Sequence, residues 1–311
     1  MPQSRPFRFA TEFHEPLPGS TWVDSIRELE GLGYSTAFFP DHFDEGPGPI
    51  AAMAAAAAVT TTLNVGALVF DCDFRHPAVL ARELATIDVI SEGRLEVGLG
   101  AGWKAVDYER SGIPMERPGV RVSRLIEHAA VLKGLWSSGP FNFSGEHYTI
   151  TDLDGTPTPY RQGGPPILVG GGAPRLLKWA GATADIVGVN PSIHSGEIDH
   201  AAAEDGLAER IDQKFEWLRE GAGDRIDEIE LNCWLAVAEV NEDPSFADAV
   251  AELFGTDGES LRQAPMALFG SASDIAETLH ARRERWGYSY IVIPGEKVRD
   301  FAPIVASLTG T

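Results

Sequence analysis

The chain has 311 residues, of which 43% are hydrophobic, and its formal net charge is −21. This length accommodates one large α/β barrel or two ordinary domains. The acidic balance disfavours nucleic acid and anionic membranes as partners, because phosphate binding needs a basic face. No apolar run reaches the ~18–20 residues that span a bilayer, and the first residues lack an apolar signal core. We therefore expect a cytoplasmic protein.

Strand-like and helix-like segments alternate along the chain. Apolar or β-branched runs predict eight strands, several of them buried on both faces, at residues 7–13, 35–40, 63–70, 94–100, 166–170, 185–189, 229–240 and 288–294. Helical spacing of apolar residues, with Ser, Thr or Pro at the start and Gly at the end, predicts helices at residues 22–32, 51–58, 77–90, 120–136, 174–181, 201–221, 272–286 and 298–311.

The alternation favours a (β/α)8 TIM barrel, which typically needs ~250 residues. The surplus falls in two insertions, residues 139–164 with a short strand at 147–151, and residues 241–265. We see no linker, so we expect one domain over 1–311. An open, doubly wound sheet is the alternative.

The most informative segment is residues 93–103, GRLEVGLGAGW. It predicts a buried strand that runs into a glycine-rich turn. Gly98, Gly100 and Gly102 leave the backbone uncovered, so that a flat or anionic ligand can approach closely. A tightly packed barrel strand with a plain turn explains the same glycines.

Barrel active sites lie at the carboxyl ends of the strands, and the second predicted strand ends at Asp41-His42. An imidazole with an ordinary pKa of about 6.5 can move a proton at neutral pH. Adjacent residues on a strand point to opposite faces, so Asp41 need not contact His42. The alternative is a helix-capping Asp and a His paired with backbone.

Gly170-Gly171-Gly172 precedes a helix that opens at Pro174. Backbone N–H groups and the helix dipole would favour a phosphate there, and Arg175 would add donors. A tight turn is the alternative. The block has neither the P-loop nor the dinucleotide-binding spacing.

Other polar or aromatic residues stand at the predicted strand ends. Glu12 and His14 are candidate polar groups beside a substrate, or else parts of a solvated loop, and Trp103 and Phe70 are candidate pocket walls. His76 has the position of a helix cap. Cys72 has no partner base, and neither Cys72 nor Cys233 has metal-ligand spacing, so we expect reduced thiols and no metal site.

Together these segments resemble the luciferase-like monooxygenase superfamily. The similarity rests on Pro40-Asp41-His42-Phe43 and on residues 64–69 (NVGALV), 75–83 (RHPAVLARE), 87–103 (IDVISEGRLEVGLGAGW), 165–172 (PPILVGGG) and 184–187 (ADIV). It covers most of the chain from about Phe7 to Pro191, and the last strand.

The resemblance implies a barrel that binds coenzyme F420 or FMN at its carboxyl face. It implies His42 and Glu12 as catalytic residues. The cofactor would be held by Asp41, Ala67, Leu68, Val69, Ala101, Gly102, Gly170, Gly171, Gly172 and Arg175. The Asp41-His42 pair resembles the F420-dependent branch, which would transfer a hydride to or from an uncharged organic molecule. The family also implies a non-proline cis peptide at Leu68–Val69 and a homodimer.

Two alternatives remain. One is an FMN-dependent monooxygenase that uses dioxygen and a separate reductase; the other is a barrel that binds a ligand without catalysis. A sugar phosphate is disfavoured, because Lys214 and Lys297 are the only lysines after Gly181. A polyanionic cofactor tail would need a local basic set such as Arg75, Lys104, Arg161 and Arg175.

Overall fold

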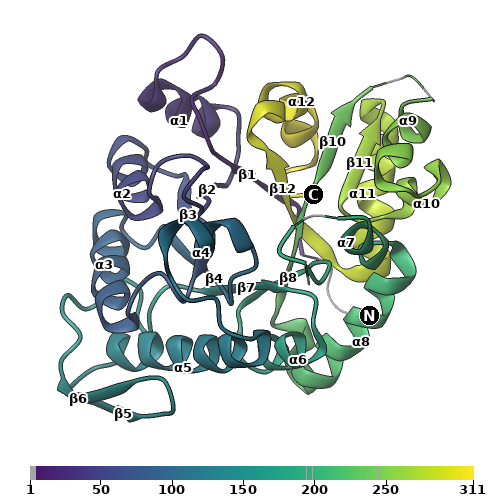
Figure 1. The fold of residues 1–311 in the computed structure, drawn as a ribbon. Helices are drawn as coiled ribbons and strands as arrows, with labels where there is room; N and C mark the ends of the chain where they lie inside the picture. Colours follow the sequence, from purple (N-terminus) through teal and green to yellow (C-terminus); the bar gives the residue numbers. More distant parts are fainter. Residues whose placement is uncertain (1–4, 194, 198, 242, 244) are drawn as a thin grey trace.

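A computed structural model of the chain describes residues 5–193, 195–197, 199–241, 243 and 245–311. Eight parallel strands close into a barrel in the order β1–β12–β9–β8–β7–β4–β3–β2, and β2 returns to β1 (Figure 1). In chain order these strands are β1 (Arg8–Glu12), β2 (Thr36–Phe39), β3 (Asn64–Asp71), β4 (Leu95–Gly100), β7 (Ile167–Gly171), β8 (Ile186–Val189), β9 (Glu230–Trp234) and β12 (Tyr288–Pro294). Closure confirms the predicted (β/α)8 barrel and excludes the open sheet.

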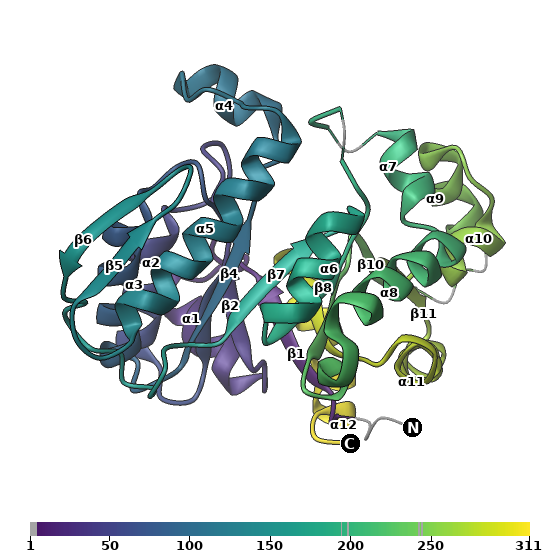
Figure 2. The same ribbon diagram turned by 90° about the horizontal axis from the view of Figure 1, so that it is seen from below.

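Helices surround the barrel (Figure 2). Their buried apolar residues belong to the same large cluster as strand residues. The helices are α1 (Trp22–Gly31), α2 (Pro49–Val59), α3 (Pro77–Ile90), α5 (Pro118–Trp136), α6 (Pro174–Thr183), α8 (Ala208–Ala222), α11 (Ala272–Trp286) and α12 (Val298–Leu308). Local chemistry fixes several helix ends. Thr21 caps α1, and Ser271 and Asp274 form a reciprocal capping box at the start of α11.

The core has two layers, because successive strand residues point in opposite directions. Outward-facing side chains such as Phe9, Val65 and Val97 pack against the helices in one large cluster. Inward-facing side chains form a second cluster inside the barrel, made of Ala10, Phe38, Leu168, Ile186, Tyr290 and Val292. The barrel is therefore filled, not a channel.

A partly buried ionic group closes the amino-terminal end of the barrel. The guanidinium of Arg8 donates to Glu96 Oε1 and Glu230 Oε2, both at 2.5 Å, and lies 3.4 Å above the ring of Tyr290. The Tyr290 hydroxyl donates to Glu96 Oε2 at 2.8 Å. These charged groups pair with one another, and they lie at the end of the barrel opposite to the carboxyl ends of the strands.

Two expectations about strands need correction. Segment 139–164 contains a hairpin, β5 (Phe141–Ser144) with β6 (Thr149–Leu153), where one strand at 147–151 is predicted. The single strand predicted at 229–240 is two: β9 ends at Trp234, and β10 (Val237–Val240) leaves the barrel to pair in parallel with β11 (Ala267–Gly270). The apolar pattern continues through both strands, so it does not mark the break.

Helices differ in three places. The helix predicted at 201–221 is divided at Gly206 into α7 (His200–Asp205) and α8. A short helix that is not predicted, α4 (Ala105–Ser111), follows the glycine run. The 241–265 segment contains α9 (Phe246–Phe254) and α10 (Gly258–Gln263). Short 3₁₀ turns, η1 (Gly223–Asp227) and η2 (Gly295–Lys297), complete the elements.

The hairpin and the β10–β11 unit lie on opposite sides of the barrel in both views (Figures 1 and 2). Among the residues that the structure describes, no helix is both long enough and apolar enough to traverse a lipid bilayer.

Candidate active site

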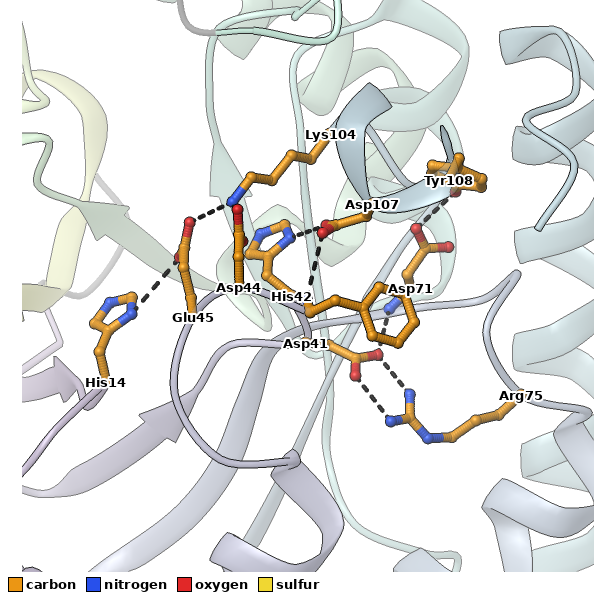
Figure 3. Close-up of polar contacts among 11 residues, drawn as sticks. His14, Asp41, His42, Asp44, Glu45, Asp71, Arg75, Lys104, Asp107 and Tyr108 are labelled. Carbon is orange, nitrogen blue, oxygen red and sulfur yellow. Dashed lines mark hydrogen bonds and ion pairs between the residues drawn. The ribbon is translucent and has the colours of Figure 1, made fainter. Parts of the chain in front are cut away.

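His42 and Asp107 form a close pair at the carboxyl end of β2. His42 Nδ1 lies 2.6 Å from Asp107 Oδ2, and Asp107 Oδ1 also accepts from the Phe43 N–H at 3.3 Å (Figure 3). The Asp107 side chain is 3% exposed and that of His42 is 20% exposed. A carboxylate on Nδ1 favours the tautomer with the proton on Nδ1, so that Nε2 is the nitrogen left for chemistry.

The Trp103 ring packs edge-to-face against the His42 ring, with the ring centroids 5.5 Å apart. Asp107 lies in the first turn of α4, directly after the glycine-rich turn. Sequence reasoning missed Asp107, which is 65 positions from His42. The available signal was an acidic residue in the first turn of a helix that begins at a barrel strand's end.

Asp41 and His42 lie in the loop after β2, not in the strand, and Asp41 has partners of its own. Both its oxygens accept from Arg75, at 2.5 and 2.8 Å, and Oδ2 also accepts from the Asp71 N–H at 3.1 Å. The pair ties the end of β2 to the loop after β3. Arg75, suggested for a phosphate tail, is therefore already neutralised by Asp41.

A second acidic residue, Asp71, is the last residue of β3. Its Oδ2 accepts from the Tyr108 hydroxyl at 2.6 Å, and its Oδ1 accepts from the Asp73 N–H at 2.9 Å. Burial raises the pKa of Asp71 to about 6 against these hydrogen bonds. This carboxyl group therefore titrates near neutral pH, close to the His42–Asp107 pair (Figure 3).

Asp71, Cys72 and Asp73 have ligand atoms within 4.8 Å of one another. The guanidinium of Arg124 already pairs with Asp73, and burial raises the pKa of the Cys72 thiol far above its usual value. The Arg124 guanidinium thus provides a positive charge beside these carboxylates, and the Cys72 thiol is neutral.

The rim beside β1 carries Glu12 and His14. Glu12 Oε2 accepts from Trp234 Nε1 at 2.8 Å and lies 3.6 Å from His14 Nε2. The carboxylates of Glu12 and Glu45 raise the pKa of His14. Lys104 donates to Asp44 at 2.6 Å and to Glu45 at 2.5 Å, so it ties the loop after β2 to the end of β4 (Figure 3).

The peptide bond Leu68–Val69 is cis, as the resemblance implies. Two glycines in and after β4 lie close to other backbone or side-chain atoms. A methyl group on Gly98 would stand 2.0 Å from the Ala67 carbonyl oxygen, and one on Gly102, at φ +74°, 1.8 Å from the Tyr108 hydroxyl. Close packing of β3 and α4 therefore accounts for these two glycines. Ala67, Leu68 and Val69 are in β3, which pairs with β4, and Ala101 directly follows β4.

Phe70 is not a pocket residue. The register of β3 against β4 shifts between Ala67 and Phe70. Phe70 then faces the helices and is fully buried in the outer cluster, whereas Leu68 and Val69 pack on the inner one.

Gly170 and Gly171 end β7, and the turn continues through Gly172 to Ala173, which makes no side-chain cap for α6. The Gly172 carbonyl accepts from Lys214 Nζ at 3.1 Å, and Lys214 pairs with Asp205 at 2.5 Å. Lys214 was not predicted to lie here. Nothing in its sequence surroundings points to the turn, which it reaches from α8.

Of the other basic residues suggested for a phosphate, Arg175 bonds to α5 and Arg161 lies at the opposite end of the barrel. Arg175 donates to Gly119 O at 3.0 Å and Ser123 Oγ at 2.9 Å on α5. Arg161 precedes β7 and lines a surface cavity of about 640 Å³ at the amino-terminal end of the barrel. His76 caps α3, as its position predicts: its Nδ1 accepts from the Ala78 N–H at 3.2 Å.

The fold and this site define a (β/α)8 barrel whose polar side chains gather at the carboxyl ends of β1, β2 and β4. Residues 6–216 match the model of the luciferase-like monooxygenase family, and the chain belongs to that family.

Its relatives include monooxygenases and F420-dependent oxidoreductases. Pyrimidine monooxygenase RutA of Pseudomonas savastanoi pv. phaseolicola is 35% identical over 146 residues, 45% of this chain and 38% of that protein. F420-dependent glucose-6-phosphate dehydrogenase of Amycolatopsis mediterranei is 31% identical over 171 residues, 52% and 51% of the two chains. The matches thus span about half or less of these relatives.

Among solved structures, the coenzyme F420 dependent tetrahydromethanopterin reductase of Methanopyrus kandleri superposes with a TM-score of 0.75 over 98% of both chains, at 18% identity. At that identity the likeness shows the fold.

Proposed function

We propose that this chain is an F420-dependent oxidoreductase that transfers a hydride between the deazaflavin and an uncharged organic substrate. The observation that carries the proposal is the His42–Asp107 pair beside Trp103, at the carboxyl end of a luciferase-like barrel. The similarity to an F420-dependent dehydrogenase supports the choice of cofactor.

The chain's residues fit a flat ring with an anionic tail. Gly170 leaves its strand end without a side chain, and the nearest atom that an added methyl group would meet is 3.3 Å away. The start of α6 has no side-chain cap, so its first N–H groups remain available to a phosphate. Val69, Gly170 and Gly171 would hold the cofactor, which supplies a two-electron hydride carrier when bound.

His42 Nε2 would give or take the proton that accompanies hydride transfer, while Asp107 fixes the ring. Glu12, held by Trp234 and His14, is the second polar group on the rim. Trp103 would form the wall of the substrate pocket.

An uncharged substrate agrees with the charges around the barrel mouth. Lys214 and Lys297 are each paired with a carboxylate, Asp205 and Glu239. Neither is left to grip a phosphate group. Phe43, which is 61% exposed, stacks near Phe74 with centroids 4.9 Å apart and adds an apolar surface beside His42.

The second candidate is an FMN-dependent monooxygenase that receives reduced flavin from a separate reductase. The relation to pyrimidine monooxygenase RutA favours it. The third candidate is a flavin-binding barrel without catalysis.

Titration of the apo-protein with F420 and with FMN, followed by fluorescence, separates the three candidates. We expect micromolar or tighter binding of F420 and much weaker binding of FMN, which would justify a substrate screen with reduced F420. Preference for FMN would move the protein to the monooxygenase class. Binding of neither would favour the non-catalytic barrel.

We also propose a homodimer. The outer face of α3 exposes Val79, Val89 and Ile90, which are 55%, 43% and 46% accessible, and a second copy would cover this face. Light scattering should give twice the mass of one chain, and Val79→Glu with Ile90→Glu should give a monomer. A monomeric wild type would exclude the dimer.

A further inference from the structure

Two asparagine side chains flank Gly188 of β8, one from the middle of β9 and one from the residue that follows β8. Asn232 is in β9 and is 1% exposed, and Asn190 directly follows β8. A methyl group placed on Gly188, which pairs with Asn232, would lie 3.5 Å from Asn232 Oδ1 and 3.6 Å from Asn190 Nδ2. Both amides therefore border one point beside Gly188.

Each amide has a buried atom without a hydrogen-bond partner. These atoms are Asn190 Oδ1, an acceptor, and Asn232 Nδ2, a donor. A buried polar atom that stays unpaired costs roughly 1–3 kcal/mol, so one such atom on each of two side chains that flank the same glycine points to a missing partner. Apolar residues would fill this position at lower cost.

The missing partner must bring both a donor and an acceptor. An amide always presents one of each, whichever way it is turned about its last bond. A carboxylate or phosphate offers only acceptors and would leave the carbonyl oxygens unpaired. The net charge of −21 further disfavours an anion at a buried site.

We infer that Asn190 and Asn232 form a binding subsite for a cyclic imide or lactam edge, in which an N–H stands next to a C=O. The N–H of the ligand donates to an asparagine carbonyl, and its C=O accepts from an asparagine amide. Gly170 and Gly188 keep the approach free of side chains. The subsite deepens the proposed function, because Asn190 follows β8 at the carboxyl end of the barrel, but it depends on no particular cofactor.

Two sources carry this chemistry: the pyrimidinedione ring of a flavin or deazaflavin, and a pyrimidine-type substrate. Calorimetric titration of the full chain separates them. The first arm uses riboflavin and 5-deazariboflavin, each against its N3-methyl derivative, which lacks the imide N–H. The second arm uses uracil against 1,3-dimethyluracil, with and without the cofactor that binds.

We expect N-methylation to weaken binding to the wild type roughly ten-fold or more in one arm, the cost of leaving buried amides unpaired. Asn190→Leu and Asn232→Leu should reduce that difference to within about two- to three-fold. Asn64→Leu is the matched control, because Asn64 is in the same barrel but at its amino-terminal end, where it donates to Glu96 at 3.4 Å. The Asn64→Leu protein should keep the full difference in affinity between the methylated and unmethylated ligands.

Should a leucine variant fail to fold, Asn190→Asp and Asn232→Asp repeat the test, since each removes the amide donor at nearly constant volume. Discrimination in the first arm assigns the subsite to the cofactor, and discrimination in the second assigns it to the substrate. Equal binding of methylated and unmethylated ligands in both arms overturns the inference and leaves the amides to ordered water. Imide discrimination without F420 preference would refute only the proposed cofactor.

Discussion

At the scale of single residues, the His42–Asp107 contact sets the clearest prediction. We expect His42→Ala to lower turnover roughly 100-fold, and Asp107→Asn to lower it about 10- to 100-fold, because the first removes the proton carrier and the second loosens its tautomer. Cofactor affinity should stay within a few-fold. Turnover of a substrate found by the F420 screen, measured across pH, checks both.

The double variant tests whether the two residues act as a unit. Asp107→Asn should lower turnover little further in a protein that already carries His42→Ala, since the effects of coupled residues are not additive. Asp212→Asn is the control, because Asp212 pairs with Arg285 on the outside of the barrel. Full additivity of the two losses would show that Asp107 acts independently of His42.

Asp71 predicts a pH dependence of stability. Its pKa of about 6 in the folded protein is above the value of about 3.9 expected when unfolded. The folded state therefore binds the proton more tightly, and the resulting stability is fully present below about pH 4 and is lost as pH rises through 6.

Asp71→Asn should for that reason be more stable than the wild type at pH 8, by at most about 3 kcal/mol, and the gap should close as pH falls toward 4. Thermal melts of both proteins from pH 4 to 8 measure it. A gap that grows on acidification would mean that the carboxylate is stabilised, not destabilised, by its surroundings.

At the scale of elements, the glycines of β4 are structural. Gly98→Ala should prevent folding or lower Tm by ten degrees or more, because the new methyl group meets the Ala67 carbonyl oxygen, which belongs to a barrel strand. Gly31→Ala, at the end of α1, meets nothing within 4 Å. That control should be neutral or stabilising by up to about 1 kcal/mol. Expression and thermal melts compare the two, and a stable Gly98→Ala protein would contradict the packing argument.

The strands and most helices could be predicted because their periodicity is local. Six of the eight barrel strands fall within the predicted runs, and β3 and β7 extend one residue beyond theirs, since two-faced burial makes each run nearly continuous in apolar residues. The boundary after Trp234 could not be predicted, because the apolar pattern runs through β9 and β10 although they belong to different sheets.

The candidate site was predictable only in part for a related reason. A strand end marks where His42, Glu12 and Trp103 lie, but contacts between distant segments set their partners. Asp107 reaches His42 from a short helix, Trp234 reaches Glu12 across 222 positions, and Lys214 reaches the Gly172 turn from α8. Single-sequence periodicity contains no information on such pairs.

At the scale of the whole molecule, the charge distribution bears on how an anionic cofactor arrives. The net charge is −21, and basic side chains near the barrel mouth are paired with carboxylates: Arg75 with Asp41, and Lys104 with Asp44 and Glu45. The protein therefore presents a repulsive long-range field to a polyanionic tail.

Salt should screen that repulsion over a Debye length of about 10 Å at 0.1 M. We expect the association rate of F420 to rise several-fold between about 20 and 200 mM salt, with a smaller rise for FMN. Uncharged riboflavin is the control and should show none. Stopped-flow fluorescence measures the three rates. A rate for F420 that falls with added salt would instead indicate an attractive basic entrance, and would require that one of the ion pairs at the barrel mouth opens to receive the tail.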